Sequence, residues 1–159
     1  MGDKLINREG EVHQMKSGQK LKILKYLNYH NIDVIFEDGV VLKNVEYSQI
    51  LKKTLKNLNT PSVCKVGYLG YGEYKTNEGD VPTKVYILWK HLIARCYDEK
   101  ELEKHPTYKD VLVCDEWKCF QNFAKWFYNN YIDGFQLDKD ILIKGNKVYS
   151  EDSCVFLPR

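Results

Sequence analysis

The hydrophobic pattern changes its period partway along the chain, and this change constrains the fold most strongly. Leu21–Leu27 (LKILKYL) and Ile32–Gly39 (IDVIFEDG) alternate apolar and polar side chains, as strands with one buried face do. Asp38 and Gly39 form a pair typical of tight hairpin turns, because glycine adopts positive φ without steric cost. Asn28–Asn31 supplies a second turn. We therefore predict a small β-rich module, a barrel or curled sheet, within residues 1–60.

A helix is predicted to end this module. In Tyr47–Leu58 (YSQILKKTLKNL), four apolar side chains recur at helical spacing, and the other side carries three lysines: Lys52, Lys53 and Lys56. Two interpretations of these lysines remain open. They form either a solvated helix face or a set of contacts to nucleic-acid phosphates.

Residues 61–82 differ from both flanking regions in composition. Val66–Asp80 contains four of the ten glycines in the chain and three of its tyrosines. The glycine spacing GxxGxG, followed by Glu73, lacks the strand-to-helix context that a phosphate-binding loop requires. We predict a linker that partly packs against its neighbours.

Two amphipathic helices are predicted next. Thr83–Tyr97 and Cys114–Tyr131 carry apolar side chains at helical spacing, and Asp115 is a suitable N-cap for the second. The aromatic stripe of the second helix is typical of a protein core. The charged segment Asp98–Pro106 (DEKELEKHP) is predicted to be an exposed connection between them.

The C-terminal segment predicts a strand, a second strand and a helix. Gln136–Ile143 (QLDKDILI) and Lys147–Ser150 (KVYS) are strand-like, and a turn containing Gly145 and Asn146 separates them. Ser150 is a suitable N-cap for a short helix over Glu151–Leu157 (EDSCVFL). The predicted class is α+β: a β-rich module, a helical segment and a C-terminal ββα unit in a domain over residues 83–159.

Charge and composition limit the classes of partner. The 159-residue chain has a net charge of +2. Residues 1–60 carry ten Lys and Arg against seven Asp and Glu, and residues 61–159 carry fourteen against fifteen, so any basic footprint is local. No apolar run approaches the roughly 20 residues of a membrane-spanning helix. Five cysteines without regular spacing indicate reduced thiols and a cytoplasmic protein. Gly2 is followed at position 6 by Ile6, so we expect no myristoylation.

A set of short motifs in the second half resembles a known family. In order, they are Trp89, ARCYD (94–98), PTY (106–108), VCDEWKCFQNFAKW (113–126), LDKDI (137–141), GNKVYS (145–150) and CVFLP (154–158). Together they resemble the HNH-type homing endonucleases of phages and prophages and their degenerate relatives. The element DVIFEDG (33–39) resembles a small module found beside such domains.

The resemblance implies a ββα unit that holds a divalent cation between an acid on the first strand and an Asn or His on the helix. A histidine beside the acid would deprotonate the attacking water. Asp138 stands at the acid's position and Ser153 at the helix ligand's position. Lys139 stands where active members have histidine, and a protonated lysine does not accept a proton from water. Asp140 could join Asp138 at a metal, because alternate residues of a strand share a face.

These residues lead to three hypotheses. The first is a phage-derived protein that binds double-stranded DNA with little or no cleavage, contacting phosphate through Lys139, Lys144, Lys147, Lys52, Lys53 and Lys56. The second is a phage protein that binds and inhibits a host defence or replication protein, using the acidic segment Asp98–Glu103 and aromatic surface. The third is an active endonuclease that uses Asp138, Asp140 and an unconventional base.

The cofactor expectations follow from these hypotheses. The first two need no cofactor, and the third needs Mg²⁺. A structural zinc site at Cys114, Cys119 and Cys154 is a further alternative, although free cysteines packed in the core are favoured. We expect the protein in the cytoplasm of a bacterial host cell.

Overall fold

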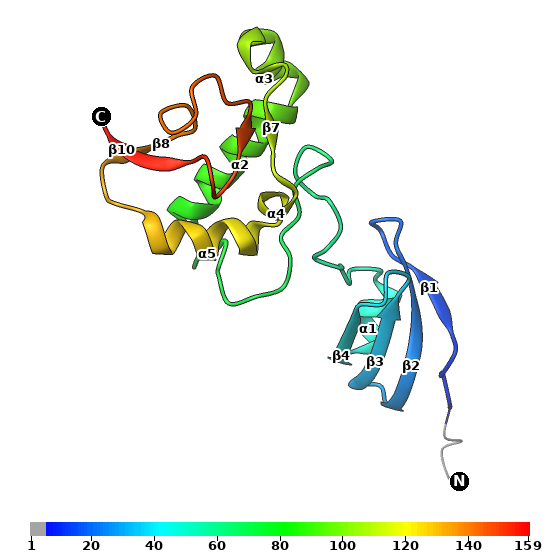
Figure 1. Cartoon of the computed structure of the whole chain (residues 1–159). Coiled ribbons are helices and arrows are strands. Elements are labelled where there is room, and N and C mark those ends of the chain that lie inside the picture. Colours follow the sequence, from blue (N-terminus) through cyan, green and yellow to red (C-terminus); the bar gives the residue numbers. More distant parts are fainter. Residues whose placement is uncertain (1–5) are drawn as a thin grey trace. The chain divides into compact units, whose positions relative to one another are not determined.

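The computed structural model describes residues 6–159, and the chain divides into two compact units (Figure 1). The first unit ends at Asn57 and the second runs from Leu58 to Arg159. Strands dominate the first unit and helices the second, which confirms the α+β class. The expectation about Gly2 concerns a position outside the described residues. No helix within residues 6–159 has the length and hydrophobicity needed to cross a bilayer.

The first unit is built on an antiparallel sheet of four consecutive strands. In sheet order these are β1 (Val12–Gln14), β2 (Lys20–Asn28), β3 (Asn31–Phe36) and β4 (Val41–Val45). Alternate residues of β2 and β3 are buried on one face, which includes Leu21, Ile23, Ile32 and Val34. Gly39 has a φ of +90°, and its N–H donates to the Phe36 carbonyl in the predicted turn. The sequence prediction of a small β-rich module is confirmed.

The helix predicted over Tyr47–Leu58 is much shorter than expected. Helix α1 covers Tyr47–Leu51, and Lys53 then adopts a φ of +59°. The Lys53 carbonyl accepts a hydrogen bond from the Lys16 N–H, and Leu55 is buried in the sheet core. Tertiary contacts therefore stabilise irregular structure where the apolar spacing predicted further helical turns. The three lysines do not share a helix face.

The second unit packs its helices around an aromatic core. Its helical elements are α2 (Lys84–Tyr97), α3 (Glu99–Lys104), a 3-10 turn η1 (Pro106–Tyr108), α4 (Asp115–Lys118) and α5 (Phe120–Asn130). Trp89, Trp117, Phe120 and Phe123 are almost fully buried. The Trp89 indole N–H donates to the Trp117 carbonyl at 2.8 Å, so the polar atom of a buried ring is satisfied. The predicted exposed connection contains α3, whose residues are all at least partly exposed.

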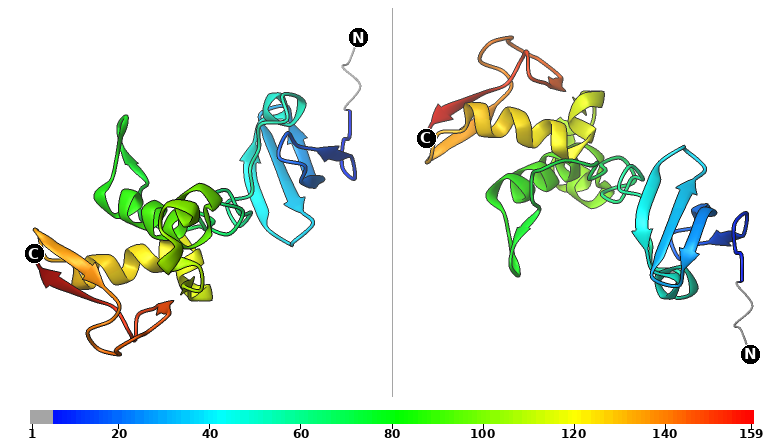
Figure 2. Two further views of the ribbon diagram at one scale, coloured as in Figure 1. Left: turned by 90° about the horizontal axis from the view of Figure 1, so that it is seen from above. Right: turned by 90° about the horizontal axis from the view of Figure 1, so that it is seen from below.

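The predicted second helix is interrupted at Cys119, which has extended backbone angles and separates α4 from α5. The interruption follows from contact with the predicted linker. The Phe120 N–H donates to the Tyr68 carbonyl, and the Tyr68 N–H donates to the Lys118 carbonyl. Residues 61–82 lie within the second unit, and a hairpin of β5 (Asn77–Glu78) and β6 (Val81–Pro82) projects beside the start of α2 (Figure 2).

The C-terminal segment contains strands and turns but no helix. Its strands are β8 (Phe135–Asp138), β9 (Val148–Tyr149) and β10 (Val155–Pro158), and a short strand β7 (Leu112–Val113) precedes α4. β8 pairs antiparallel with β10, and β9 pairs parallel with β7, so the predicted hairpin of consecutive strands does not form. The helix predicted over Glu151–Leu157 is also wrong. Phe156 is buried in a strand, its ring 5.3 Å from that of Trp126, and this packing overrides the N-cap signal of Ser150.

We expect one glycine to be essential for the junction between the linker and α5. Gly70 has a φ of +69°, and a Cβ there would lie 2.5 Å from the Cys119 Sγ, whereas Gly79 has a φ of +61° and open space around it. Gly79→Ala should cost about 1–2 kcal/mol of unfolding free energy from backbone strain. Gly70→Ala should cost roughly 1–3 kcal/mol more from overpacking.

Urea unfolding followed by tryptophan fluorescence measures this difference, because Trp89, Trp117 and Trp126 all lie in the second unit. Equal losses in the two variants would contradict the close packing of Gly70 against Cys119.

Candidate nucleic-acid interface

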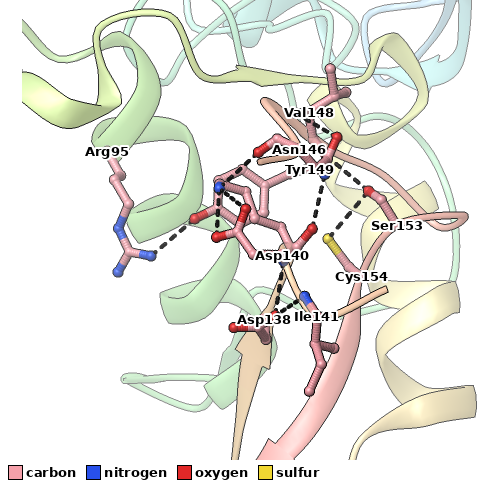
Figure 3. A network of polar contacts seen from close by, with 10 residues as sticks. Arg95, Asp138, Asp140, Ile141, Asn146, Val148, Tyr149, Ser153 and Cys154 are labelled. Atoms are coloured by element: carbon pink, nitrogen blue, oxygen red, sulfur yellow. Dashed lines mark hydrogen bonds and ion pairs between the residues drawn. The ribbon is translucent and has the colours of Figure 1, made fainter. Parts of the chain in front are cut away.

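The C-terminal loop, residues 138–154, contains the three positions that the family resemblance singles out as catalytic. Asp138 ends β8, and its Oδ1 accepts hydrogen bonds from the backbone N–H groups of Asp140 and Ile141, both at 2.8 Å (Figure 3). This is the local bonding by which aspartate stabilises a turn. The Asp138 carboxylate is therefore engaged in shaping the start of the loop.

Lys139 lies inside the loop and makes its contacts there. Its Nζ donates to both Asp140 carboxylate oxygens, at 2.8 and 2.9 Å, and to the Asn146 carbonyl at 2.9 Å. The side chain is only 12% exposed, and its Nζ lies 5.8 Å from the centre of the Tyr149 ring. An ammonium group has three donors, and all three have acceptors here. Lys139 therefore holds the loop together, and its ammonium offers no free donor to a phosphate.

Asn146 and Ser153 complete the internal bonding of the loop. The Asn146 amide donates to the carbonyls of Lys139 and Val148 and accepts from the Val148 N–H. Ser153 is buried, and its hydroxyl donates to the Val148 carbonyl at 2.8 Å. In Figure 3 the Ser153 side chain points toward Val148 and Cys154. The loop is thus cross-linked by side chains to its own backbone.

The predicted metal ligands do not suit a magnesium ion. One Asp138 oxygen already accepts two N–H groups, Asp140 is paired with Lys139, and the Ser153 hydroxyl serves as a donor. Magnesium prefers oxygen ligands in a near-octahedral arrangement. Across residues 6–159, no three His, Cys, Asp or Glu side chains gather closely enough to hold a metal ion.

The cysteines form no disulfides within the described part of the chain, and Cys119 and Cys154 are buried. Burial raises the pKa of the Cys154 and Cys114 thiols, and it raises the pKa of Cys96 to about 11. Zinc binds the thiolate, so a raised pKa weakens a cysteine as a ligand. These side chains act as core residues, the favoured interpretation of the sequence.

The other predicted phosphate contacts are exposed but scattered. Lys144 and Lys147 lie on the surface of the C-terminal loop, and Lys147 approaches the Asp110 carboxylate at 4.0 Å. Lys52, Lys53 and Lys56 are exposed in the first unit. Between Lys139 and Lys144 the loop exposes three consecutive aliphatic side chains, Ile141, Leu142 and Ile143, each more than half exposed. The sequence pattern predicted a strand over these three residues, but β8 ends before them at Asp138.

A basic surface that the sequence analysis did not single out lies on the open face of the four-stranded sheet. Lys20 and Lys22 alternate with the buried Leu21 and Ile23 on β2, so they point away from the core. The register places Lys25 opposite Asp33, and Lys43 follows the inward-facing Leu42 on β4. We call Lys20, Lys22, Lys25 and Lys43, all exposed, the basic sheet face.

The acidic residue on this face is already engaged. The Asp33 Oδ1 accepts the Asn44 N–H at 3.3 Å, in the bulge of β4. The other residues that the register places beside the lysines are Val12, Gln14, Ile35 and Val41. None of them is aromatic. The alternating sequence KLKI at 20–23 was the signal that could have revealed this face.

Comparison of the chain with protein-family models, curated proteins and solved structures gives no match. The resemblance to HNH-type endonucleases therefore rests on the motifs alone.

Removal of the Asn146 side chain should loosen the C-terminal loop. Asn146→Ala deletes three hydrogen bonds and takes the Asn146 partner from the Lys139 carbonyl and the Val148 N–H, at a cost of about 2–3 kcal/mol, while the Val148 carbonyl keeps its bond from Ser153. Lys144→Ala, at an exposed position two residues earlier, should change stability by less than about 0.5 kcal/mol.

Hydrogen–deuterium exchange of residues 138–150 reports the loop directly. We expect faster exchange in Asn146→Ala alone. Unchanged protection in that variant would mean that the side-chain bonds do not order the loop.

Proposed function

We propose that the protein binds double-stranded DNA through phosphate contacts and does not cut it. The observation that carries the proposal is the basic sheet face, where four exposed lysines share a surface with one aspartate, Asp33, so that the surface is positively charged. Lysines that neutralise phosphates release condensed counterions, which gives sequence-independent affinity. The basic surface is confined to one face of one sheet, which agrees with the net charge of only +2 for the chain.

The side chains of this face favour a duplex over a single strand. Proteins that bind single strands without sequence preference stack the bases on aromatic rings. The basic sheet face offers lysines and aliphatic side chains, which contact a sugar–phosphate backbone but provide no stacking platform. Binding should therefore depend on salt and little on sequence.

The C-terminal loop supports the absence of cleavage. Its motifs resemble those of HNH-type endonucleases, but Lys139 replaces the base and is paired with Asp140. Asp138 is bonded to two backbone N–H groups. We infer a binding protein on a degenerate nuclease-like scaffold of phage origin.

Two matched double variants test the DNA interface. Lys20→Gln/Lys22→Gln removes two charges from the basic sheet face, and Lys52→Gln/Lys56→Gln removes two from another exposed part of the same unit. Fluorescence anisotropy with a labelled duplex at several salt concentrations gives the affinity and its salt slope. The first variant should weaken binding at low salt by about tenfold or more and reduce the slope by roughly 2.

The control variant should retain most of the affinity. A larger loss in Lys52→Gln/Lys56→Gln would shift the interface to the lysines that the sequence predicted. Absence of binding to any duplex at low salt would refute the proposed function.

One observation favours the second hypothesis, that the protein binds a host protein. Ile141, Leu142 and Ile143 are exposed side by side on a loop whose base is fixed by Lys139 and Asn146. Clustered exposed aliphatic residues are typical of protein-binding surfaces. Ordering of the loop before binding would reduce the entropic cost of association.

Leu142→Ser tests this alternative. If Ile141, Leu142 and Ile143, here called the aliphatic tip, bind a host protein, the wild-type chain should retain a stoichiometric, DNA-free partner from lysate. The variant should lose this partner and keep its affinity for duplex DNA. Equal recovery of the partner by the wild-type chain and by Leu142→Ser would show that the aliphatic tip is not the contact.

A further inference from the structure

A cavity of about 470 Å³ in the second unit has no role in the proposed DNA contacts. It lies between α2, α5, β8 and β10, and its apolar lining includes Leu88, Leu92, Phe127, Phe135 and Leu137. The lining also includes Lys84, His91, Arg95 and Arg159, but no Asp or Glu. Its size falls within the range of about 300–1,000 Å³ that is usual for small-molecule sites. We call it the Arg95 pocket.

Arg95 is fixed in place without an acidic partner. Its Nη1 donates to the hydroxyl of the buried Tyr149 at 3.3 Å, and its guanidinium lies 5.3 Å from the centre of the Tyr108 ring. Among the described residues, none of the ion pairs includes Arg95. A guanidinium has five donors, and one is used here by Tyr149. Arg95 is thus oriented with most of its donors available to an anion.

The basic side chains that α2 contributes to the pocket differ in their partners, and Arg159, a fourth basic residue of the lining, follows Pro158, which pairs with Phe135. His91 precedes Arg95 by one helical turn, so the two side chains are neighbours on α2. Lys84 lies roughly 16 Å away along the helix axis, and it is paired with Asp133 at 3.1 Å. On α2, the basic side chain of the pocket that has no ion-pair partner is therefore Arg95, near the C-terminal end of the helix. The apolar side chains of Leu88 and Leu92 line the pocket between Lys84 and Arg95.

This division fits a ligand with two chemically different parts. An arginine with several free donors suits a phosphate, which it can bind through two parallel hydrogen bonds. An inorganic ion alone would leave the apolar remainder of the cavity unfilled. A flat, largely apolar ring would fill it and contact Phe135 and Tyr131, which also lines the pocket.

We propose that the Arg95 pocket binds a nucleotide, with the phosphate at Arg95 and His91 and the base over the apolar lining. The phosphate belongs either to a free nucleoside monophosphate or to the phosphorylated end of a DNA strand. The pocket and the basic sheet face lie in different units, so this proposal does not depend on the proposed function.

Isothermal titration of the full chain with adenosine 5′-monophosphate tests the proposal, with adenosine and inorganic phosphate as partial probes. The nucleotide should bind at least tenfold more tightly than either part. Arg95→Gln should weaken nucleotide binding at least tenfold, and Lys100→Gln, the same charge change at an exposed position on α3, should leave it unchanged.

Leu88→Trp serves as a second variant, because it fills the cavity two helical turns from Arg95 and leaves the tyrosine contacts intact. It should abolish binding even if Arg95→Gln proves unstable in thermal unfolding. Absence of nucleotide binding at millimolar concentration, equal binding of adenosine, or full binding by Leu88→Trp would each overturn the proposal.

Competition with short duplexes distinguishes the two sources of the phosphate. Displacement of the nucleotide by a 5′-phosphorylated duplex, but not by its 5′-hydroxyl counterpart, assigns the pocket to strand ends. No displacement by either duplex assigns it to free nucleotides. Lys20→Gln/Lys22→Gln should retain nucleotide binding while losing duplex affinity. The two titrations therefore distinguish an error in the duplex interface from an error in the pocket.

Discussion

The ammonium group of Lys139 organises the C-terminal loop. A lysine that is only 12% exposed is costly unless its donors are satisfied, and here Asp140 and the Asn146 carbonyl satisfy them. Asn146 in turn holds Val148 at the start of β9, which pairs with β7. Lys139, which stands where the family resemblance leads us to expect a proton acceptor, therefore makes structural contacts within the loop. The same bonds engage one Asp138 oxygen and both Asp140 oxygens within the loop.

Both units present basic side chains, but they do so in different settings. In the first unit, β2 alternates lysines with core residues, so one face of a sheet becomes basic. The second unit has almost no net charge, but the lining of the Arg95 pocket contains four basic residues and no acidic ones. The net charge of +2 therefore does not reveal these two local groups of basic side chains. The distribution matters because phosphate contacts act over the short distances that salt screening allows.

Local patterns predicted the elements whose stability is local. The alternation in residues 21–36 predicted β2 and β3, and the apolar spacing of residues 84–97 predicted α2. Long-range contacts decided the remainder. The Tyr68 backbone bonds to the backbone of Lys118 and Phe120 and interrupts the predicted second helix at Cys119. The Leu55 side chain packs into the core of the first unit from a segment that is not helical. At the C-terminus, packing of Phe156 against Trp126 selects a strand where Ser150 predicted a helix. The sequence motifs proposed Asp138, Lys139 and Asp140 as site residues, but their mutual bonding depends on a loop conformation that the sequence pattern did not predict.

The proposed absence of cleavage depends on a C-terminal loop that is closed by its own bonds. Supercoiled plasmid incubated with the purified chain and Mg²⁺ or Mn²⁺, beside Asp138→Ala, tests it most directly. We expect both proteins to leave the plasmid supercoiled to the same extent as a protein-free sample. Metal-dependent nicking by the wild-type chain that disappears in Asp138→Ala would contradict the account.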